Sequence, residues 1–535
     1  MPSHRILLIG ATGVFGERLA RMIVRWPDAT LVLAARRLEP LQALAARLDG
    51  PASVETAVFD RTAPEGLAAL KPWAVVDAAG PFQSSDYRLP LAALAAGAHY
   101  VDLADGRDFV AGFAAAVRPP TGLTAMAGAS STPTLSQAAL ARMTAGWTAI
   151  DAVSAAISPG GQAPRGRSAM AAILAWAGRP VRLFEAGRWT TRPGWSGPVR
   201  LRFPFMGNRW VVLADVPDLD AMPARQAPKD SAIFRAGVES PVGVWGLWLG
   251  VWLVRLGVVR SLTSLTPLLW RLTGLLTLGA SDLGGMVVQA AGRDAEGRAV
   301  LARWSLWAEP GEGPSTPAAP AAAVLRGLLD GVPGPPTLDA ILAQLRFNCI
   351  HTRLDVSWPE ARGLVPGALG PGYERLPPTV RAMHAGLTPI RAEGTTLARG
   401  SAGLAALVRA VLGLPANGRH PAVVEIVPHP YGEAWVRRFG SGRFASRITP
   451  CPDDPGAFEE TAGPISFRIR LDPDAAGFTW RLDGWRLGPL PLPRRWAPRV
   501  RARSFERDGV YRFRVMIAHP WLGVVFAYAG RLTSP

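Results

Sequence analysis

The chain has 535 residues, of which 49% are hydrophobic and only 19% are charged, so it can bury sizeable cores and is not a disordered polymer. Its 58 basic residues exceed its 41 acidic ones by 17, and all the basic residues except Lys71 and Lys229 are arginines. This surplus suits phosphates or acidic lipid headgroups, or it reflects biased base composition in the gene. No basic run or motif typical of nucleic-acid binding is visible, so we expect no nucleic-acid partner.

Scarce residue types exclude several chemistries. The two cysteines, Cys349 and Cys451, cannot form a disulfide framework and indicate a reducing compartment. The histidines and cysteines lack zinc-ligand spacings, so we expect no metal. The lysines fit neither a Tyr-x-x-x-Lys reductase pair nor a Gly-Lys-[Ser/Thr] phosphate loop. The apolar run at 6–9 is too short for a signal peptide, and we expect a cytoplasmic protein.

Residues 1–125 alternate short apolar runs with segments of helical periodicity. The expected strands are 5–9, 30–35, 54–59, 74–78 and 100–103. The expected helices between them are 17–26, 41–48, 66–70 and 89–96. This alternation predicts an α/β domain with a Rossmann-type parallel sheet and helices on both faces.

Two further domains are expected. Residues 126–332 carry strand-like runs at 210–213, 286–290 and 301–307, an apolar segment at 240–281 and a helix at 321–329, which predicts a mixed α+β domain. The Gly/Pro-rich run at 331–336 marks the expected boundary. Residues 338–535 alternate apolar and polar positions in many short runs after two helical segments, which predicts an α+β domain dominated by an antiparallel sheet.

A glycine-rich turn follows the first expected strand and opens a helix. Its pattern is G-x-x-G-x-x-G, in which glycine permits a tight turn and close approach of the backbone to a pyrophosphate at the helix N-terminus. The residues are Gly10, Ala11, Thr12, Gly13, Val14, Phe15 and Gly16. A structural strand–helix turn would also need glycine, but the strands on either side favour a dinucleotide site.

The end of the second expected strand indicates which dinucleotide binds. An NAD enzyme would carry Asp or Glu there, whereas this chain has Arg36 and Arg37, whose guanidinium groups can bind a 2′-phosphate. The sequence therefore predicts NADP. Asp60, which follows the third strand, is placed either to meet the adenine or to cap the next turn.

Asp102 ends the fifth expected strand, where ligands bind in open α/β sheets. Reduction of a carbonyl or enoyl group needs a proton, and a partly desolvated carboxyl can supply it. Asp102 is therefore the candidate catalytic acid. A strand-end aspartate that caps the following turn, with water as the proton source, is the alternative.

Three motifs, at 76–82, 96–103 and 127–135, give the chain a family resemblance. The first ~330 residues resemble the saccharopine dehydrogenase-like NADP-binding family. The resemblance implies that Ala79, Gly80 and Pro81 line the nicotinamide side, but the substrate residues of true saccharopine reductases have no match here. Residues 338–535 resemble a domain of unknown function that follows such reductases, with Arg375, His384, Glu433 and Arg437 among the matching points.

The segment 240–281 contains three charges, Arg255, Arg260 and Arg271, and no acidic residue. Its longest uncharged stretch, 240–254, is shorter than a membrane span requires. Gly246 and Gly250 form a G-x-x-x-G pattern that permits close helix approach. Tryptophan with arginine is typical of a helix in a membrane interface, while a buried hairpin, a homodimer contact and a spanning helix are the alternatives.

The combined interpretation is an NADPH-dependent oxidoreductase for a small hydrophobic substrate, such as a lipid- or polyketide-like carbonyl or enoyl compound. The segment 240–281 would bind an anionic membrane surface peripherally, on the inner membrane face. The alternative is a non-catalytic NADP-binding scaffold or a lipid-handling protein.

Overall fold

The structure is a computed structural model. It describes residues 4–83, 85–163, 173–237, 239–267, 280–357, 363–386, 389–411, 414–429, 432–451, 454–462, 465–487 and 490–533. The chain forms two compact units, Met1–Ser357 and Trp358–Pro535, each with its own hydrophobic core.

The first unit begins with a parallel sheet. Within the described residues six strands run in the order β3-β2-β1-β4-β5-β6. The strands are β1 His4–Ile9, β2 Ala29–Ala35, β3 Ser53–Val58, β4 Ala74–Asp77, β5 His99–Asp102 and β6 Ala125–Met126. Central strands are apolar almost throughout because both faces of a parallel sheet are covered. The predicted Rossmann-type sheet is confirmed.

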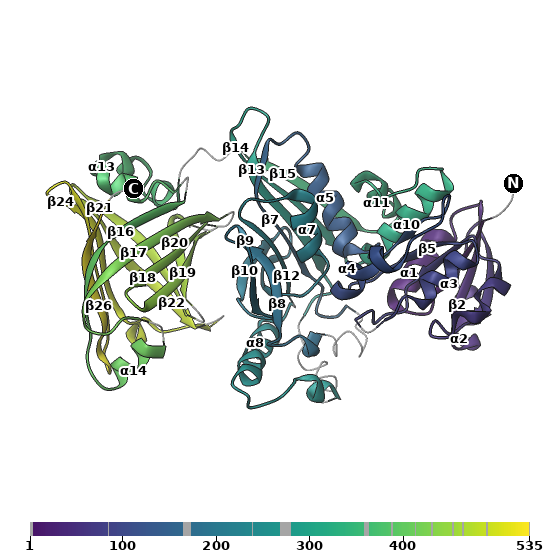
Figure 1. The fold of residues 1–535 in the computed structure, drawn as a ribbon, viewed down its shortest axis with the longest axis horizontal. Coiled ribbons are helices and arrows are strands. Elements are labelled where there is room, and N and C mark those ends of the chain that lie inside the picture. The colour runs from purple at the N-terminus through teal and green to yellow at the C-terminus, as the bar shows by residue number, and fades with distance from the viewer. Residues whose placement is uncertain are drawn as a thin grey trace. The chain divides into compact units, whose positions relative to one another are not determined.

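Helices cover both faces of this sheet (Figure 1). They are α1 Val14–Ile23, α2 Leu38–Ala45, the 3₁₀ helix η1 Pro64–Leu70, α3 Arg88–Ala95 and α4 Arg107–Ala116. Alternate residues of a strand point to opposite faces. Ile6 and Leu8 of β1 therefore join one core with Leu19, whereas Leu7 and Ile9 join the other.

A second, mixed sheet follows. Among the described residues nine strands form it, and β12 is parallel to β7. They are β7 Ala149–Ser158, β8 Pro180–Glu185, β9 Arg188–Pro193, β10 Val199–Phe203, β11 Gly207–Leu213, β12 Ser231–Gly237, β13 Gly284–Arg293, β14 Ala299–Ala308 and β15 Ile350–Ser357. The helical segments are η2 Ser131–Leu135, α5 Ser136–Met143, α7 Asp218–Gln226, α8 Pro241–Arg255 and η3 Thr263–Leu265. The predicted mixed domain is confirmed.

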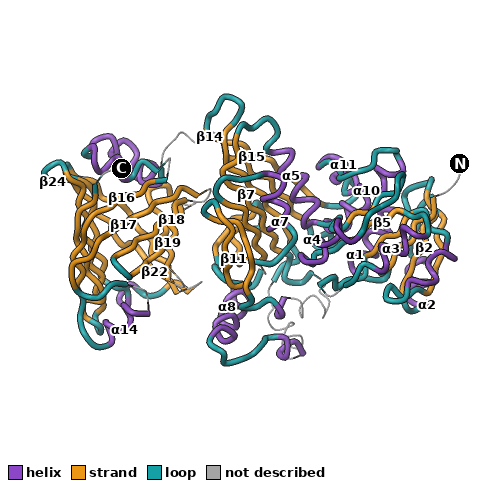
Figure 2. The backbone as a smooth tube through the Cα atoms, in the orientation of Figure 1, coloured by secondary structure: helices purple, strands orange, loops and turns teal. Residues whose placement is uncertain are grey.

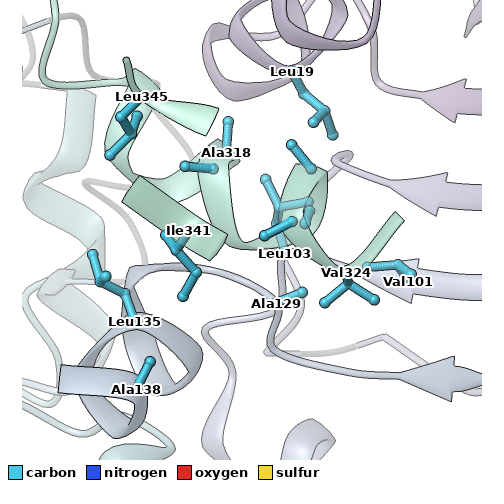
Figure 3. Close-up of a cluster of buried hydrophobic side chains, with 14 of the residues drawn as sticks. Leu19, Val101, Leu103, Ala129, Leu135, Ala138, Ala318, Val324, Ile341 and Leu345 are labelled. Atoms are coloured by element: carbon cyan, nitrogen blue, oxygen red, sulfur yellow. The ribbon is translucent and has the colours of Figure 1, made fainter. Parts of the chain in front are cut away.

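After β14 the chain returns to the first sheet through α10 (Ser315–Leu329) and α11 (Leu338–Gln344). Helix α10 packs on α1 and on β5, and Val324 lies beside Val101 (Figure 3). One continuous core thus includes side chains from both sheets and from α10. The two lobes of the first unit are joined by apolar packing as well as by the connecting chain.

The division between the units differs from the expected boundary at 331–336. It lies after Ser357, because β15 pairs with β14 over eight residues and Ile341 of α11 joins the first unit's core. The Gly/Pro-rich run is a connection inside the first unit. Residues 358–362, where the second unit begins, lie outside the described part.

The second unit is dominated by an antiparallel sheet, as predicted. Within its described residues the sheet closes on itself, because β21 pairs with both β20 and β22. Its strands are β16 Ile390–Arg399, β17 Gly418–His429, β18 Gly432–Phe439, β19 Gly442–Cys451, β20 Asp454–Ala462, β21 Ile465–Asp474, β22 Gly477–Leu487, β23 Leu490–Pro491, β24 Arg499–Arg507, β25 Val510–His519 and β26 Gly523–Leu532.

Short helices stand at the two ends of this closed sheet, with α14 at one end and α13 at the other (Figures 1 and 2). They are α12 Leu364–Leu369, η4 Gly370–Arg375, α13 Pro378–Met383, α14 Leu404–Val411 and η5 Arg494–Trp496. His384 follows α13 and is buried against Trp435, and its Nε2 lies 3.0 Å from the Tyr511 hydroxyl. Burial lowers the pKa of His384 to about 3. His384 and Glu433, two of the residues on which the resemblance to a domain of unknown function rests, are therefore part of this unit's buried interior.

Candidate functional site

A cavity of about 1720 Å³ lies in the first unit, between the carboxyl ends of the parallel strands and the second sheet. Its polar end contains the glycine-rich turn and the loops after β2, β3 and β4. Its other end is an apolar chamber lined by the second sheet and α8. Pockets for a single small molecule usually measure about 300–1,000 Å³, so this cavity has room for a dinucleotide and a second ligand.

The glycine-rich turn forms the first wall of the polar end. Gly10 has φ +77°, and a Cβ there would lie 2.9 Å from Ala79. A Cβ on Gly16 would collide with the Gly10 carbonyl oxygen. Thr12, Gly13, Val14 and Phe15 line the cavity, while Ala11 is buried behind them. The free N–H groups of the first turn of α1 suit a pyrophosphate, so these residues fit the predicted dinucleotide.

Arg36 and Arg37 follow β2, are exposed and line the same end. In the described part of the chain neither guanidinium makes an ion pair or a side-chain hydrogen bond. Asp60 also lines this end, and its Oδ1 accepts hydrogen bonds from Thr62 N at 2.9 Å and Thr62 Oγ1 at 2.8 Å. These bonds, with the nearby charge of Arg36, lower the pKa of Asp60. Asp60 therefore caps its turn and borders the cavity at once.

The loop after β4 forms the opposite wall, where Ala79, Gly80 and Pro81 line the cavity. Asp77, at the end of β4, is fully buried and accepts a hydrogen bond from Ala79 N at 3.0 Å. Arg61 binds the other carboxylate oxygen at 2.6 Å. Burial raises the pKa of Asp77, while the Arg61 charge opposes this shift. The ion pair holds the 79–81 wall against the loop after β3.

Asp102 does not line the cavity. It is fully buried, and its Oδ1 accepts hydrogen bonds from Gly128 N at 2.8 Å and Ala104 N at 3.0 Å. Burial raises the pKa of Asp102 to about 7, because the charged form is desolvated. This geometry supports the alternative role of Asp102, in which its carboxylate caps the turn after β5 and joins it to the loop that contains Gly128. The role of catalytic acid stays a prediction, and it needs a proton path to the cavity.

The structure brings residues to the site that the sequence did not single out. Arg61 lines the cavity beside the 79–81 wall, and Ser130, Ser131 and Thr132 line it from the segment after β6. Thr316, in the first turn of α10, lines it as well, and its buried Oγ1 has no hydrogen-bond partner among the described residues. Thr316 reaches the cavity because α10 packs on α1. No local sequence pattern predicts this packing of two distant segments.

The chamber beyond the dinucleotide end is mainly apolar. Side chains of the second sheet and of its preceding loops line it, including Ile157, Trp176, Trp195, Val212, Phe234, Met286 and Leu306. Arg107, the basic side chain in the described lining of this part, and the acidic Glu239 are each held in ion pairs. Arg107 Nη1 lies 2.9 Å from Asp215 and its Nη2 2.6 Å from Asp220, while Glu239 lies 2.9 Å from Arg209. In the described lining the chamber therefore presents no unpaired basic side chain to a carboxylate substrate.

Helix α8 closes one side of the chamber. Ser240 caps its N-terminus by accepting a hydrogen bond from Gly243 N at 3.4 Å. Gly243, Gly246 and Gly250 all line the cavity. Among the described residues no atom lies within 4 Å of the position that a Cβ on Gly246 would take, and Gly250 packs against Leu262. Residues 268–279 of the predicted apolar segment lie outside the described residues. Among the helices that the structure describes, none is long and apolar enough to cross a membrane.

The fold and the cavity define a nucleotide-cofactor-binding protein of Rossmann type. Residues 6–143 match the family described as the saccharopine dehydrogenase NADP binding domain, and residues 376–532 match the family described as a domain of unknown function (DUF4166). Comparison with curated proteins gave no significant match. Both predicted resemblances are confirmed.

Solved structures that match part of the chain include saccharopine dehydrogenase (L-Glu forming) from Saccharomyces cerevisiae. It has 13% identity and a TM-score of 0.47, and the match covers 66% of this chain and 100% of that one. Homospermidine synthase from Legionella pneumophila, in complex with NAD, has 12% identity and a TM-score of 0.43, with 68% and 94% covered.

Proposed function

We propose that this protein is an NADPH-dependent oxidoreductase that reduces a neutral, apolar carbonyl or enoyl compound. The observation that carries the proposal is the cavity that connects the glycine-rich turn to an apolar chamber, in whose described lining the basic residue Arg107 is already ion-paired. A dicarboxylic substrate would need unpaired cations in the chamber. An apolar substrate needs only the surface that the chamber offers.

In this proposal the residues at the polar end of the cavity bind the cofactor, and those of the apolar chamber bind the substrate. The turn from Gly10 to Gly16 would hold the pyrophosphate, and Arg36 and Arg37 would bind the 2′-phosphate. The 79–81 wall, fixed by the Asp77–Arg61 pair, would position the nicotinamide ring. Bound NADPH would supply a hydride to the electrophilic carbon of the substrate and leave as NADP⁺.

The substrate's π bond would open as the carbon accepts the hydride, and the carbonyl oxygen or the α-carbon would then take a proton. Ser130, Ser131 and Thr132 border the cavity and can orient a water that donates this proton. Asp102, at the end of β5, accepts a hydrogen bond from Gly128 N in the loop that leads to these residues, and its carboxyl remains the candidate acid if a water connects it to the cavity.

The proposal is tested with purified full-length protein. NADPH oxidation is followed with neutral ketones, aldehydes and enoyl thioesters of increasing chain length, and with 2-oxoglutarate, a ketone with two carboxylates, as the charged comparison. We expect turnover to rise with chain length and to be absent with 2-oxoglutarate. NADPH binding without oxidation by any apolar acceptor would instead support the non-catalytic scaffold or lipid-handling protein.

A further inference from the structure

Helix α8 has two opposite faces with different surroundings. Gly243, Gly246, Leu247, Gly250 and Leu253 recur at helical spacing and line the cavity. Of these glycines, Gly250 is packed, because a Cβ there would lie 2.5 Å from the Leu262 side chain. At Gly246 no described atom lies within 4 Å of the position that a Cβ would take. This face of α8 is therefore a wall that adds space to the chamber.

The opposite face carries a row of indole rings. Trp245 packs on Trp210 of β11 with ring centroids 5.3 Å apart, and Trp248 and Trp252 continue the row at 5.4 and 6.0 Å. The row starts at the sheet and ends at the surface. Trp252 is 42% exposed, Leu249 56% and Leu256 71%, and Val258 follows at 66%. Trp252, Leu256 and Val258 form an exposed apolar patch at the end of α8, and the tryptophan row connects this patch to the sheet. Leu249 is exposed as well but also lines the cavity, so it lies between the two faces.

The charged residues around this apolar surface indicate which kind of partner binds it. Arg255 and Arg260 are exposed beside it, and the Arg255 guanidinium lies 5.4 Å from the Trp252 ring centroid. The sequence from 240 to 281 contains no acidic residue. A symmetric contact between two copies would bring arginines against arginines without a carboxylate from this segment. Phosphate headgroups beside an apolar layer match both the arginines and the apolar side chains.

We propose that the exposed patch at the end of α8, formed by Trp252, Leu256 and Val258, docks on an anionic lipid bilayer, and that the apolar substrate passes from the bilayer into the chamber beside the glycine face. The membrane contact stands on the surface of α8 alone, whereas the passage of substrate rests on the proposed function. The helix lies in the interface and does not span the bilayer.

Membrane docking is tested by flotation of the full-length protein with vesicles of phosphatidylcholine, with and without about 30% phosphatidylserine. The key variant is Leu256→Glu, and the matched control is Val332→Glu, because Val332 is 70% exposed on the same unit and remote in sequence from α8. We expect Leu256→Glu to reduce partitioning at least about tenfold and Val332→Glu to leave it unchanged. We also expect binding of the unmodified protein to weaken as salt rises.

The chamber is tested separately with Nile red, a neutral apolar dye, in the absence of vesicles. Gly246→Leu should weaken dye binding at least about fivefold and leave vesicle binding intact, because the new side chain fills the chamber. Leu256→Glu should do the reverse. A protein that stays unbound on anionic vesicles, or one that sediments as a dimer that Leu256→Glu dissociates, would overturn the docking proposal. If Gly246→Leu binds the dye as tightly as the unmodified protein, the proposed passage of substrate through the chamber is overturned. Neither the vesicle result nor the dye result depends on turnover.

Discussion

Arg61 Nη2 lies 2.6 Å from Asp77 Oδ2, and this ion pair joins the loops after β3 and β4 at the edge of the cofactor end of the cavity. The Asp77 carboxylate is fully buried, and its other oxygen accepts the Ala79 N–H. Removing only the cation would leave a buried charge without compensation, which typically costs about 3–5 kcal/mol.

We therefore expect Arg61→Met to lower the unfolding free energy by roughly 3–5 kcal/mol at pH 8. Without Arg61 the pKa of Asp77 rises further, so at lower pH the folded carboxyl takes up a proton and the loss becomes smaller. Asp77→Asn in the same background should recover most of the stability. Urea unfolding measures all three, with Arg88→Met as the control, because the Arg88–Asp86 pair is exposed. Equal losses at Arg61 and Arg88 would contradict the prediction.

The unpaired arginines after β2 give a prediction of cofactor preference. Arg36→Glu with Arg37→Glu should weaken NADPH binding by about 1.5–3 kcal/mol for each charge-assisted hydrogen bond removed, roughly tenfold to 150-fold, and should affect NADH much less. Fluorescence titration with both cofactors measures this. Arg118→Glu makes the same charge change on an exposed residue of the same domain that does not line the cavity. Equal affinity of the unmodified protein for NADPH and NADH would remove the basis for the preference.

Asp102 allows two roles to be separated by a pair of variants. Asp102→Asn keeps an acceptor for the Gly128 and Ala104 N–H groups, so its stability should change little, whereas Asp102→Ala should lose roughly 2–6 kcal/mol for two unsatisfied buried donors. If Asp102 is the acid, the asparagine variant should keep NADPH affinity and lose about 10²-fold or more in turnover. Retained turnover would leave it the role of a cap alone.

Asp218 links stability to pH. It is buried on α7 with the Ser136 hydroxyl as its hydrogen-bond donor, and burial raises its pKa to about 7. Between about pH 4 and 7 the folded state keeps a proton that the unfolded chain releases. The unfolding free energy should therefore fall as pH rises, by at most about 1.4 kcal/mol per pH unit for this group, and level off above pH 7.

The Asp218→Asn variant carries no titrating proton, so its stability should decline less steeply over the same range. Urea unfolding at pH 4.5 to 8 compares the slopes, with the exposed Asp339→Asn as the reference. Parallel slopes for all three proteins would show that Asp218 does not titrate in this range.

The sequence predicted the first sheet well because its strands are continuous apolar runs with glycine turns between them. It did not predict β7, whose residues 149–158 are mostly small, with weak preference for a strand. Helix α4 was missed as well. At the site, the glycine turn and the arginines after β2 are local patterns, so the sequence reveals them. The Arg61–Asp77 pair and the position of Thr316 depend on contacts between distant segments, which no local pattern encodes.

The return of α10 to α1 has a consequence for how the first unit unfolds. Leu19 of α1, Val101 of β5 and Val324 of α10 share one core (Figure 3). Arg18 also donates a hydrogen bond to the Gly311 carbonyl at 2.8 Å. The family match at 6–143 therefore does not correspond to an independent folding unit. A fragment that ends at 143 would expose the apolar side of α1 to water. Calorimetry should record both lobes of the first unit melting in one cooperative transition, and limited proteolysis should not release the dinucleotide-binding lobe intact.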